Sequence, residues 1–150
     1  MIREYTKAEI DILVDIWYQS SLIAHDFIDK DYWKSKREEM KEKYLPMSEN
    51  YVISKNAEIM GFISMVDNYL AALFIDAKYQ GEGHGKELLN FIKKRRKKIQ
   101  LKVFKKNNKA VNFYLQNEFV IKEELIDEET SEKEFLMEWE DNSSNTKIMS

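Results

Sequence analysis

The sequence predicts a single α/β domain, with a central mixed sheet of about seven strands flanked by about four helices. The length of 150 residues suits one domain with one hydrophobic core. Strand and helix patterns alternate along the chain and then end in a hairpin, which is typical of a mixed sheet covered by helices. Three of the four glycines fall within residues 81–85, between an apolar segment and a helical pattern.

The first half of the chain predicts four strands and two helices. A short strand at residues 1–5 precedes Thr6-x-x-Glu9, a capping box that opens a helix reaching Trp17. A polar, aromatic stretch over residues 18–29 follows this helix. A second helical pattern runs from residue 33 to residue 44, and Pro46 ends it. The remaining strands are expected at residues 51–54, 59–66 and 70–75, with a turn at Asn56 between the first two.

The second half begins with a helix that follows the glycines and is expected to end near Lys98. A strand at residues 100–104 comes next, and then a helix capped by Asn107 or Asn108. Residues 119–126 and 133–139 predict a terminal hairpin. We therefore expect a domain over residues 1–140 and a polar, disordered tail over residues 141–150.

Composition excludes several classes of protein. The chain has no cysteine, so disulfides, thiolate metal sites and acyl transfer through a cysteine intermediate are excluded. No segment approaches the roughly 18 apolar residues of a membrane span. The N-terminus, Met1-Ile2-Arg3-Glu4, lacks the apolar region of a secretion signal. We expect a cytoplasmic protein with no membrane partner.

The net charge of −3 is unevenly distributed along the chain. Residues 93–109 carry ten lysines or arginines and no acid, whereas residues 118–141 carry eleven acids and two lysines. Two solvated faces that attract each other explain this pattern. Alternatively, the basic segment attracts an anionic cofactor and the acidic segment a cationic amine. Nucleic-acid binding is disfavoured, because no aromatic residues are interleaved with the basic run.

The glycine cluster, Gln80-Gly81-Glu82-Gly83-His84-Gly85-Lys86, has the features of a phosphate-binding loop. A strand that turns through glycines into a helix presents unpaired backbone N–H groups at the positive end of the helix dipole. A P-loop is excluded, because only three residues separate Gly81 from Gly85 and Glu87 follows Lys86. A dinucleotide fingerprint is also excluded, because Lys86 occupies the position of its third glycine.

The spacing that does fit is Gln-x-x-Gly-x-Gly, as Gln80, Gly83 and Gly85. It resembles the pyrophosphate motif of the GNAT superfamily of acetyl-CoA-dependent N-acyltransferases. Asn107-x-x-Ala110-x-x-Phe113-Tyr114, closing with Phe119, resembles the second cofactor-side segment of this family. Residues 24–28 and 44–46 resemble a subgroup of small, single-domain bacterial members. The resemblance covers roughly residues 1–140 and implies a GNAT-like domain.

This resemblance implies acetyl-CoA as a co-substrate and no metal. The backbone of the fourth strand is expected to pair with the pantetheine arm, and the loop amides to hold the pyrophosphate. Asn107 is explained equally well as a helix cap, and Phe113 as a core residue. The predicted cofactor-binding residues are Leu73, Phe74, Ile75, Gln80, Gly81, Gly83, His84, Gly85, Lys86, Asn107 and Phe113.

Tyr114 is the candidate proton donor to the departing thiolate. A phenol with an ordinary pKa of about 10 can protonate a thiolate whose conjugate acid has a pKa of about 8.5. In the GNAT family a tyrosine at this position has that role, although Tyr114 can also simply pack beside Ala110. The general base is left open between His25, Asp67, Glu124 and a water molecule. His25 is our candidate for the general base; alternatively, it is a histidine packed in the core.

The predicted function is transfer of an acetyl group from acetyl-CoA to a primary amine of a small molecule or a protein. The alternative is a non-catalytic acetyl-CoA-binding or interaction module on the same fold. The protein is expected to be a monomer or a homodimer. One departure from the family pattern is Glu118, which stands before Phe119 where a glycine is usual.

Overall fold

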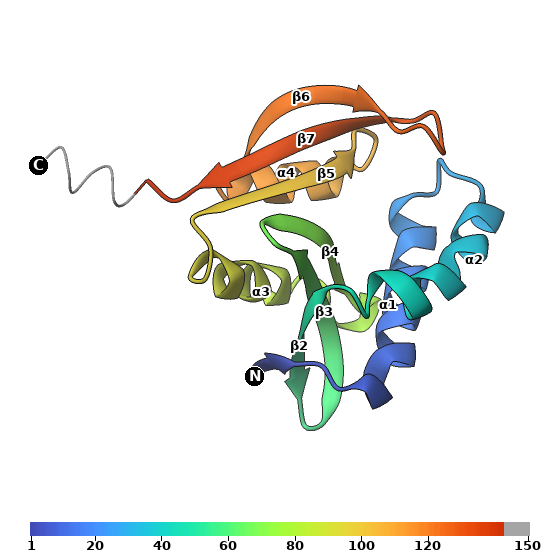
Figure 1. Ribbon diagram of the computed structural model, residues 1–150, viewed down its shortest axis with the longest axis vertical. Coiled ribbons are helices and arrows are strands. Elements are labelled where there is room, and N and C mark those ends of the chain that lie inside the picture. Colours follow the sequence, from blue (N-terminus) through green and yellow to red (C-terminus); the bar gives the residue numbers. More distant parts are fainter. Residues whose placement is uncertain (143–150) are drawn as a thin grey trace, which may run out of the picture. The chain divides into compact units, whose positions relative to one another are not determined.

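The computed structural model describes residues 1–142, which fall into two compact units (Figure 1). The first unit is Met1–Leu89, and the second begins at Asn90. Together the described residues form seven strands and four α-helices, the numbers expected from the sequence. Most of the tail that we expected to be disordered, residues 143–150, lies outside the described residues.

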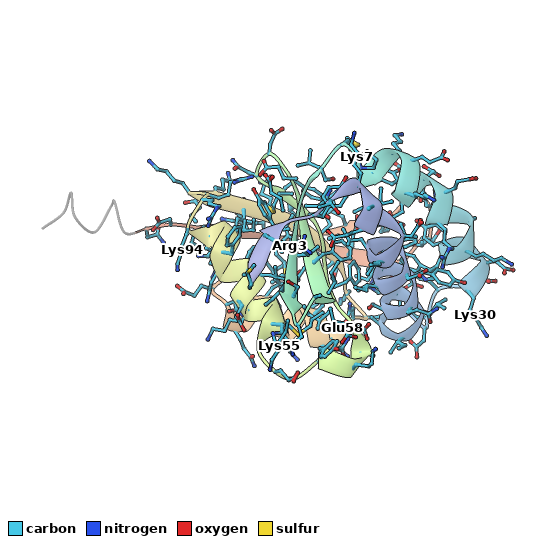
Figure 2. The ribbon with its side chains drawn as sticks, turned by 90° about the horizontal axis from the view of Figure 1, so that it is seen from below. Arg3, Lys7, Lys30, Lys55, Glu58 and Lys94 are labelled. Carbon is cyan, nitrogen blue, oxygen red and sulfur yellow. The ribbon has the colours of Figure 1, made fainter. Side chains whose placement is uncertain are left out.

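The sheet of the first unit is an antiparallel meander in the order β1-β2-β3-β4. Its strands are β1 (Ile2–Glu4), β2 (Glu49–Lys55), β3 (Glu58–Val66) and β4 (Tyr69–Ile75). Asn56 and Ala57 both have positive φ, 53° and 65°, in the two-residue turn between β2 and β3. These angles are typical of a type I′ turn, and Lys55 and Glu58 flank it (Figure 2). Fully buried side chains of β2 and β3 contribute to the core, among them Ile53, Phe62, Ile63 and Met65.

The predicted capping box forms at the start of the first helical segment. The Thr6 backbone N–H donates to Glu9 Oε1 at 2.8 Å, and a short 3-10 helix, η1 (Lys7–Glu9), leads into α1 (Ile10–Ala24). Arg3 donates to both Glu9 oxygens, at 2.9 and 2.7 Å. This contact lowers the pKa of Glu9 to about 2, because the guanidinium stabilises the carboxylate. Strand β1 and the helix start are thereby joined. Helix α1 continues past Trp17 to Ala24, so it includes part of the polar, aromatic stretch that was expected to follow it.

The second helix, α2 (Lys30–Glu39), lies beside α1 (Figure 1). Arg37 pairs with Asp15 of α1 at 2.7 Å, and Lys41 pairs with Asp11 at 2.9 Å. The helix continues as one π turn, η2 (Met40–Tyr44), in which the Leu45 N–H donates to Met40 O at 3.0 Å. The helical pattern up to Tyr44, just before Pro46, is therefore confirmed, but its last turn is wider than an α-helix.

Helix α3 (His84–Lys93) begins inside the glycine cluster and ends earlier than the sequence predicted. The expected end near Lys98 is wrong, because Lys98 is the first residue of strand β5 (Lys98–Phe104). The last turn closes when the Arg95 N–H donates to Ile92 O at 2.8 Å. The Arg95 guanidinium also donates to Phe91 O at 2.9 Å and so satisfies a carbonyl near the helix end.

The second unit holds a three-stranded antiparallel sheet in the order β5-β7-β6. Helix α4 (Asn108–Gln116) lies beside β5 (Figure 1) and precedes the hairpin of β6 (Val120–Ile126) and β7 (Lys133–Glu140). The terminal hairpin predicted from the sequence is confirmed. The core of this unit is built from Ile99, Leu101, Phe119 and Met137. No helix within residues 1–142 has the length and apolar character needed to cross a membrane.

Candidate active site

The glycine cluster forms the strand–turn–helix arrangement that the sequence predicted. Gly81 and Gly83 have φ of +82° and +86°, a region that side-chain-bearing residues rarely adopt. A Cβ atom added at either glycine would meet no atom within 4 Å. These glycines are therefore favoured by the conformation of the backbone and not by crowding around their Cα atoms.

The start of α3 supplies the backbone donors of this loop. The first hydrogen bond of the helix runs from the Glu87 N–H to Gly83 O, at 3.1 Å. The amides of His84, Gly85 and Lys86 thus belong to the first turn, where an α-helix offers no carbonyl partners. Together with the positive end of the helix dipole, these amides suit an anion.

The turn that leads into the loop is braced against neighbouring strands. The Asp76 N–H donates to Met60 O of β3 at 2.8 Å, and the Asp76 side chain accepts from the Lys78 N–H at 3.0 Å. This closes a short 3-10 helix, η3 (Ala77–Tyr79). Gln80 turns back and donates through Nε2 to Ile75 O at 3.0 Å. The turn is therefore held at the end of β4, directly before the glycines.

The side chain of His84 lies between two carboxylates of the same segment. Its Nε2 and Nδ1 atoms are each 3.5 Å from an oxygen, of Glu82 and Glu87 respectively. The imidazole therefore contacts the loop itself. The expectation that the loop amides, including that of His84, hold the pyrophosphate stays a prediction, as do the ligand contacts of Gln80 and Lys86.

The end of β4 pairs with β3 through residues that we expect to hold the pantetheine arm. Leu73, Phe74 and Ile75 lie opposite Ile63, Phe62 and Gly61 and are half-buried. A Cβ at Gly61 would lie 2.4 Å from Ile75 Cδ1 and 2.6 Å from Phe74 O. Gly61 therefore permits a close approach of the two strands. Sequence reasoning missed this role, although a glycine inside an apolar strand is a known signal of close approach.

Replacing Gly61 by alanine is expected to destabilise the fold and shift the end of β4. The added methyl group would meet a backbone oxygen that cannot turn aside, so the strands must separate locally. Overpacking of this kind costs roughly 1–3 kcal/mol of unfolding free energy. Urea unfolding at neutral pH measures the loss. Unchanged stability would contradict the close approach of β3 and β4 at this position.

His25 lies in an aromatic cluster at the end of α1. Its ring stacks on Trp33 at a centroid distance of 5.0 Å and contacts the edge of Phe27 at 5.9 Å. Its backbone N–H donates to Ser21 O at 2.9 Å. Burial lowers the pKa of His25 to about 4, because the charged imidazolium loses its hydration. These features favour the packed alternative, since a general base works best with a pKa near the working pH.

The other candidates for the general base are exposed. Asp67 lies in the turn between β3 and β4 with φ of 52°. Glu124, on β6, pairs with Lys105 at 2.7 Å, and this contact lowers its pKa. A lowered pKa makes the Glu124 carboxylate a weaker base. The general base stays unassigned.

Tyr114 is fixed by the way in which α4 ends. The Phe119 N–H donates to Tyr114 O at 3.0 Å and the Glu118 N–H donates to Leu115 O at 3.3 Å, the pattern of a Schellman motif. The Tyr114 ring packs edge-on against Phe119 at 5.4 Å and against Phe113 at 5.2 Å. Tyr114 is 7% exposed. Its ring position is therefore set by local contacts.

Asn107 begins the same helix. Its side-chain oxygen accepts from the Ala110 N–H at 3.3 Å, and its carbonyl accepts from the Val111 N–H at 3.0 Å. The helix-cap interpretation of Asn107 is therefore confirmed. Contacts of Asn107 and of the half-buried Phe113 with a cofactor stay predictions.

Glu118 adopts φ of 73°, so the turn after α4 forms without the glycine that the family pattern favours. Replacing Glu118 by glycine is expected to raise the free energy of unfolding by up to about 1 kcal/mol, because glycine occupies this left-handed conformation without a steric penalty. Urea unfolding measures the gain. The control is Gln116→Gly in the last turn of α4, which is expected to lower stability by up to about 1 kcal/mol. A lower free energy of unfolding for Glu118→Gly would contradict the assignment of this turn.

Comparisons with known proteins agree with this geometry. A family model for the acetyltransferase (GNAT) domain matches residues 5–137. The chain is 31% identical over 140 residues to the peptidyl-lysine N-acetyltransferase YiaC of Escherichia coli, covering 93% of this chain and 96% of that protein. It is 29% identical over 114 residues to YjaB of E. coli, also a peptidyl-lysine N-acetyltransferase, covering 75% and 77% of the two chains.

Solved structures show the same fold. The apo form of E. coli YjaB superposes with a TM-score of 0.82 at 24% identity, over 93% of this chain and 96% of that chain. The PaiA N-acetyltransferase of Thermoplasma acidophilum, solved in complex with coenzyme A, superposes with a TM-score of 0.80 at 23% identity, over 94% of this chain and 98% of that chain. The predicted fold class is confirmed. Within residues 1–142, no group of three or more His, Cys, Asp or Glu side chains could hold a metal ion. The chain belongs to the GNAT superfamily of acetyl-CoA-dependent N-acetyltransferases.

Proposed function

We propose that this protein transfers the acetyl group of acetyl-CoA directly to a primary amine. The observation that carries the proposal is the turn at Gly81 and Gly83, where two positive φ angles lead into the first turn of α3. Backbone amides of this turn and helix start would hold the pyrophosphate. The edge of β4 at residues 73–75 would pair with the amides of the pantetheine arm.

Tyr114 is the proton donor in this proposal. Acetyl transfer breaks the bond between the carbonyl carbon and sulfur, so the departing thiolate needs a proton. A phenol donates that proton readily, because its ordinary pKa of about 10 is close to and above that of a thiol. Support comes from the fixed, buried position of the Tyr114 ring at the end of α4.

A lysine side chain of a protein is the acceptor that we propose to test first. The relatives YiaC and YjaB are both peptidyl-lysine N-acetyltransferases, at 31% and 29% identity. The attacking amine must be neutral, so the enzyme would need to select or generate the unprotonated form. Action in the cytoplasm, as a monomer or a homodimer, stays a prediction.

The deciding experiment is a screen of amines with acetyl-CoA that measures released thiol. The panel contains lysine peptides of different flanking charge, free amino acids and polyamines. Turnover with at least one amine is the expected result. Thermal stabilisation by acetyl-CoA without turnover on any amine would instead favour the non-catalytic binding module.

The phosphate loop is tested separately, by replacing Gly83 with valine. A β-branched residue at positive φ is strongly strained, so the loop must change its backbone conformation. We expect the thermal stabilisation by acetyl-CoA to be lost. The matched control is Glu82→Val, because Glu82 lies between the two glycines and has no positive φ. Equal stabilisation of both variants would contradict the role of the loop.

A further inference from the structure

Glu58 lies far from the glycine cluster in sequence but contacts the turn that leads into it. This residue is the first of β3 and follows the β2–β3 turn, where it is seen beside Lys55 (Figure 2). Its Oε1 atom is 3.3 Å from Lys78 Nζ. The Glu58 carboxylate also interacts with the Tyr79 hydroxyl, as the pKa values of both groups indicate. Lys78 and Tyr79 belong to η3, and Tyr79 is followed directly by Gln80 and Gly81.

The contact with Tyr79 has an electrostatic signature. Donation of the phenol proton to the Glu58 carboxylate raises the pKa of Tyr79 to about 12, because the neutral phenol is the form that donates. The same contact lowers the pKa of Glu58, followed by the contact with Lys78. One carboxylate therefore engages two consecutive residues of the turn through two different kinds of donor.

The backbone of the same turn is attached to β3 at a second point. Asp76 donates to Met60 O at 2.8 Å, two residues beyond Glu58. Tyr79 donates through its N–H to Asp76 O at 2.9 Å, so the turn is closed at its other end. Glu58 thus adds a side-chain attachment at the end of η3 that is nearer to the glycines. With both attachments, the start of β3 fixes where the loop begins.

We propose that Glu58 is a positioning residue for acetyl-CoA, acting through Lys78 and Tyr79 on the backbone of the phosphate loop. This inference rests on the proposed function of that loop. Glycines have more backbone conformations to lose than other residues, so ordering a loop that contains them costs conformational entropy when it binds a ligand. A support at the start of the loop reduces that loss. Removal of this support should therefore weaken cofactor binding and leave the chemical step unchanged.

The chain offers a close control for this proposal. Glu39 on α2 also engages one lysine and one tyrosine, with Lys36 Nζ at 3.4 Å and Tyr44 Oη at 3.3 Å. None of these three residues adjoins the glycine cluster in sequence. Glu39→Gln therefore removes the same charge from the same kind of contact without touching the turn before the loop.

The test measures CoA binding by calorimetry and steady-state kinetics with acetyl-CoA for Glu58→Gln, Tyr79→Phe, the double variant and Glu39→Gln. We expect Glu58→Gln to raise the Kd of CoA and the KM of acetyl-CoA by up to about fivefold, with kcat at saturation unchanged, because the Lys78 and Glu58 side chains are 69% and 53% exposed and exposed ion pairs are weak. Tyr79→Phe should raise the Kd and the KM by a smaller factor. Because the two residues act through one contact, the effect of the double variant should be smaller than the two single effects combined. Glu39→Gln should bind like the wild type.

Each contrary outcome has a distinct meaning. Equal CoA affinity of the wild type and Glu58→Gln would overturn the inference and leave the proposed function intact. The same loss of affinity in Glu39→Gln would show a general charge effect and would also overturn it. A lowered kcat with unchanged KM would place Glu58 in the chemical step and contradict a positioning role. Absence of CoA binding by the wild type would overturn the proposed function, and this inference with it.

Discussion

Replacing Tyr114 by phenylalanine is expected to lower kcat by about 10²- to 10⁴-fold, the usual contribution of a positioned general acid. The change removes only the hydroxyl group. The phenylalanine ring can keep the edge-on contacts with Phe119 and Phe113, and the Schellman motif that fixes residue 114 involves backbone atoms alone. Folding and CoA binding should therefore be retained, so that the loss falls on the chemical step.

The measurement is steady-state kinetics with saturating acetyl-CoA and the best amine from the screen, together with CoA binding by calorimetry. The control is Tyr51→Phe, because the Tyr51 hydroxyl donates to Glu49 at 3.0 Å on β2 and has no place in the proposed chemistry. A kcat for Tyr114→Phe within about twofold of the wild type would show that the thiolate receives its proton elsewhere. Loss of CoA binding would instead assign Tyr114 a role in holding the cofactor.

The parts of the fold that the sequence predicted well depend on contacts between near neighbours in the chain. The capping box needs only Thr6 and Glu9, three residues apart, and it forms as expected. Asn107 caps α4 through Ala110, again three residues away. The turn into α3 contains Gly81 and Gly83, two residues apart, and both adopt the positive φ that glycine permits. In each case the physical cause lies within one turn of backbone.

The end of α3 was misjudged because its cause is not local. Residues 93–98 are basic and contain no glycine or proline that would end a helix, so the predicted helix runs to Lys98. In the folded chain Lys98 lies opposite Glu140 of β7 and pairs with Glu138 at 3.2 Å. These partners are 42 and 40 residues away in sequence. The sequence of residues 93–98 alone therefore does not indicate the pairing. The strand therefore forms through its pairing with β7.

The glycine turn was predictable from its residue types, whereas the residues that support it were not. Gln80 and the glycines stand out by spacing, whereas Gly61 and Glu58 act across the contact of β3 with β4 and η3. Such contacts appear only once the register of the strands is known. The same holds for His25, because its burial depends on Trp33 from the next helix. From the sequence, a catalytic and a packed histidine look alike.

The second large effect concerns stability rather than catalysis. The free energy of unfolding is expected to fall by about 3 kcal/mol as the pH decreases from neutrality to about 4, through the titration of His25 alone. Well above pH 6.5 the imidazole is neutral in both the folded and the unfolded chain, so it does not make the free energy of unfolding depend on pH. Between pH 6.5 and about 4 the unfolded chain binds a proton that the folded protein does not. Stability is therefore lost progressively across this window.

Urea unfolding at several pH values, compared between the wild type and His25→Gln, isolates this effect. Carboxylates titrate in the lower part of the same window, but they are common to both proteins and cancel in the difference. Glutamine at position 25 is expected to lower stability at neutral pH and to flatten the dependence between pH 6.5 and 4. His84→Gln, which removes the other histidine of the chain, should keep the slope that His25 produces.

The result would also decide between the two interpretations of His25. A slope of the expected size requires an imidazole that stays neutral and dry in the folded protein, packed between Trp33 and Phe27. Such a group is a poor acceptor for the proton of an ammonium near neutral pH. An unchanged slope in His25→Gln, together with a large fall in kcat, would contradict the packed interpretation and restore His25 as the general base.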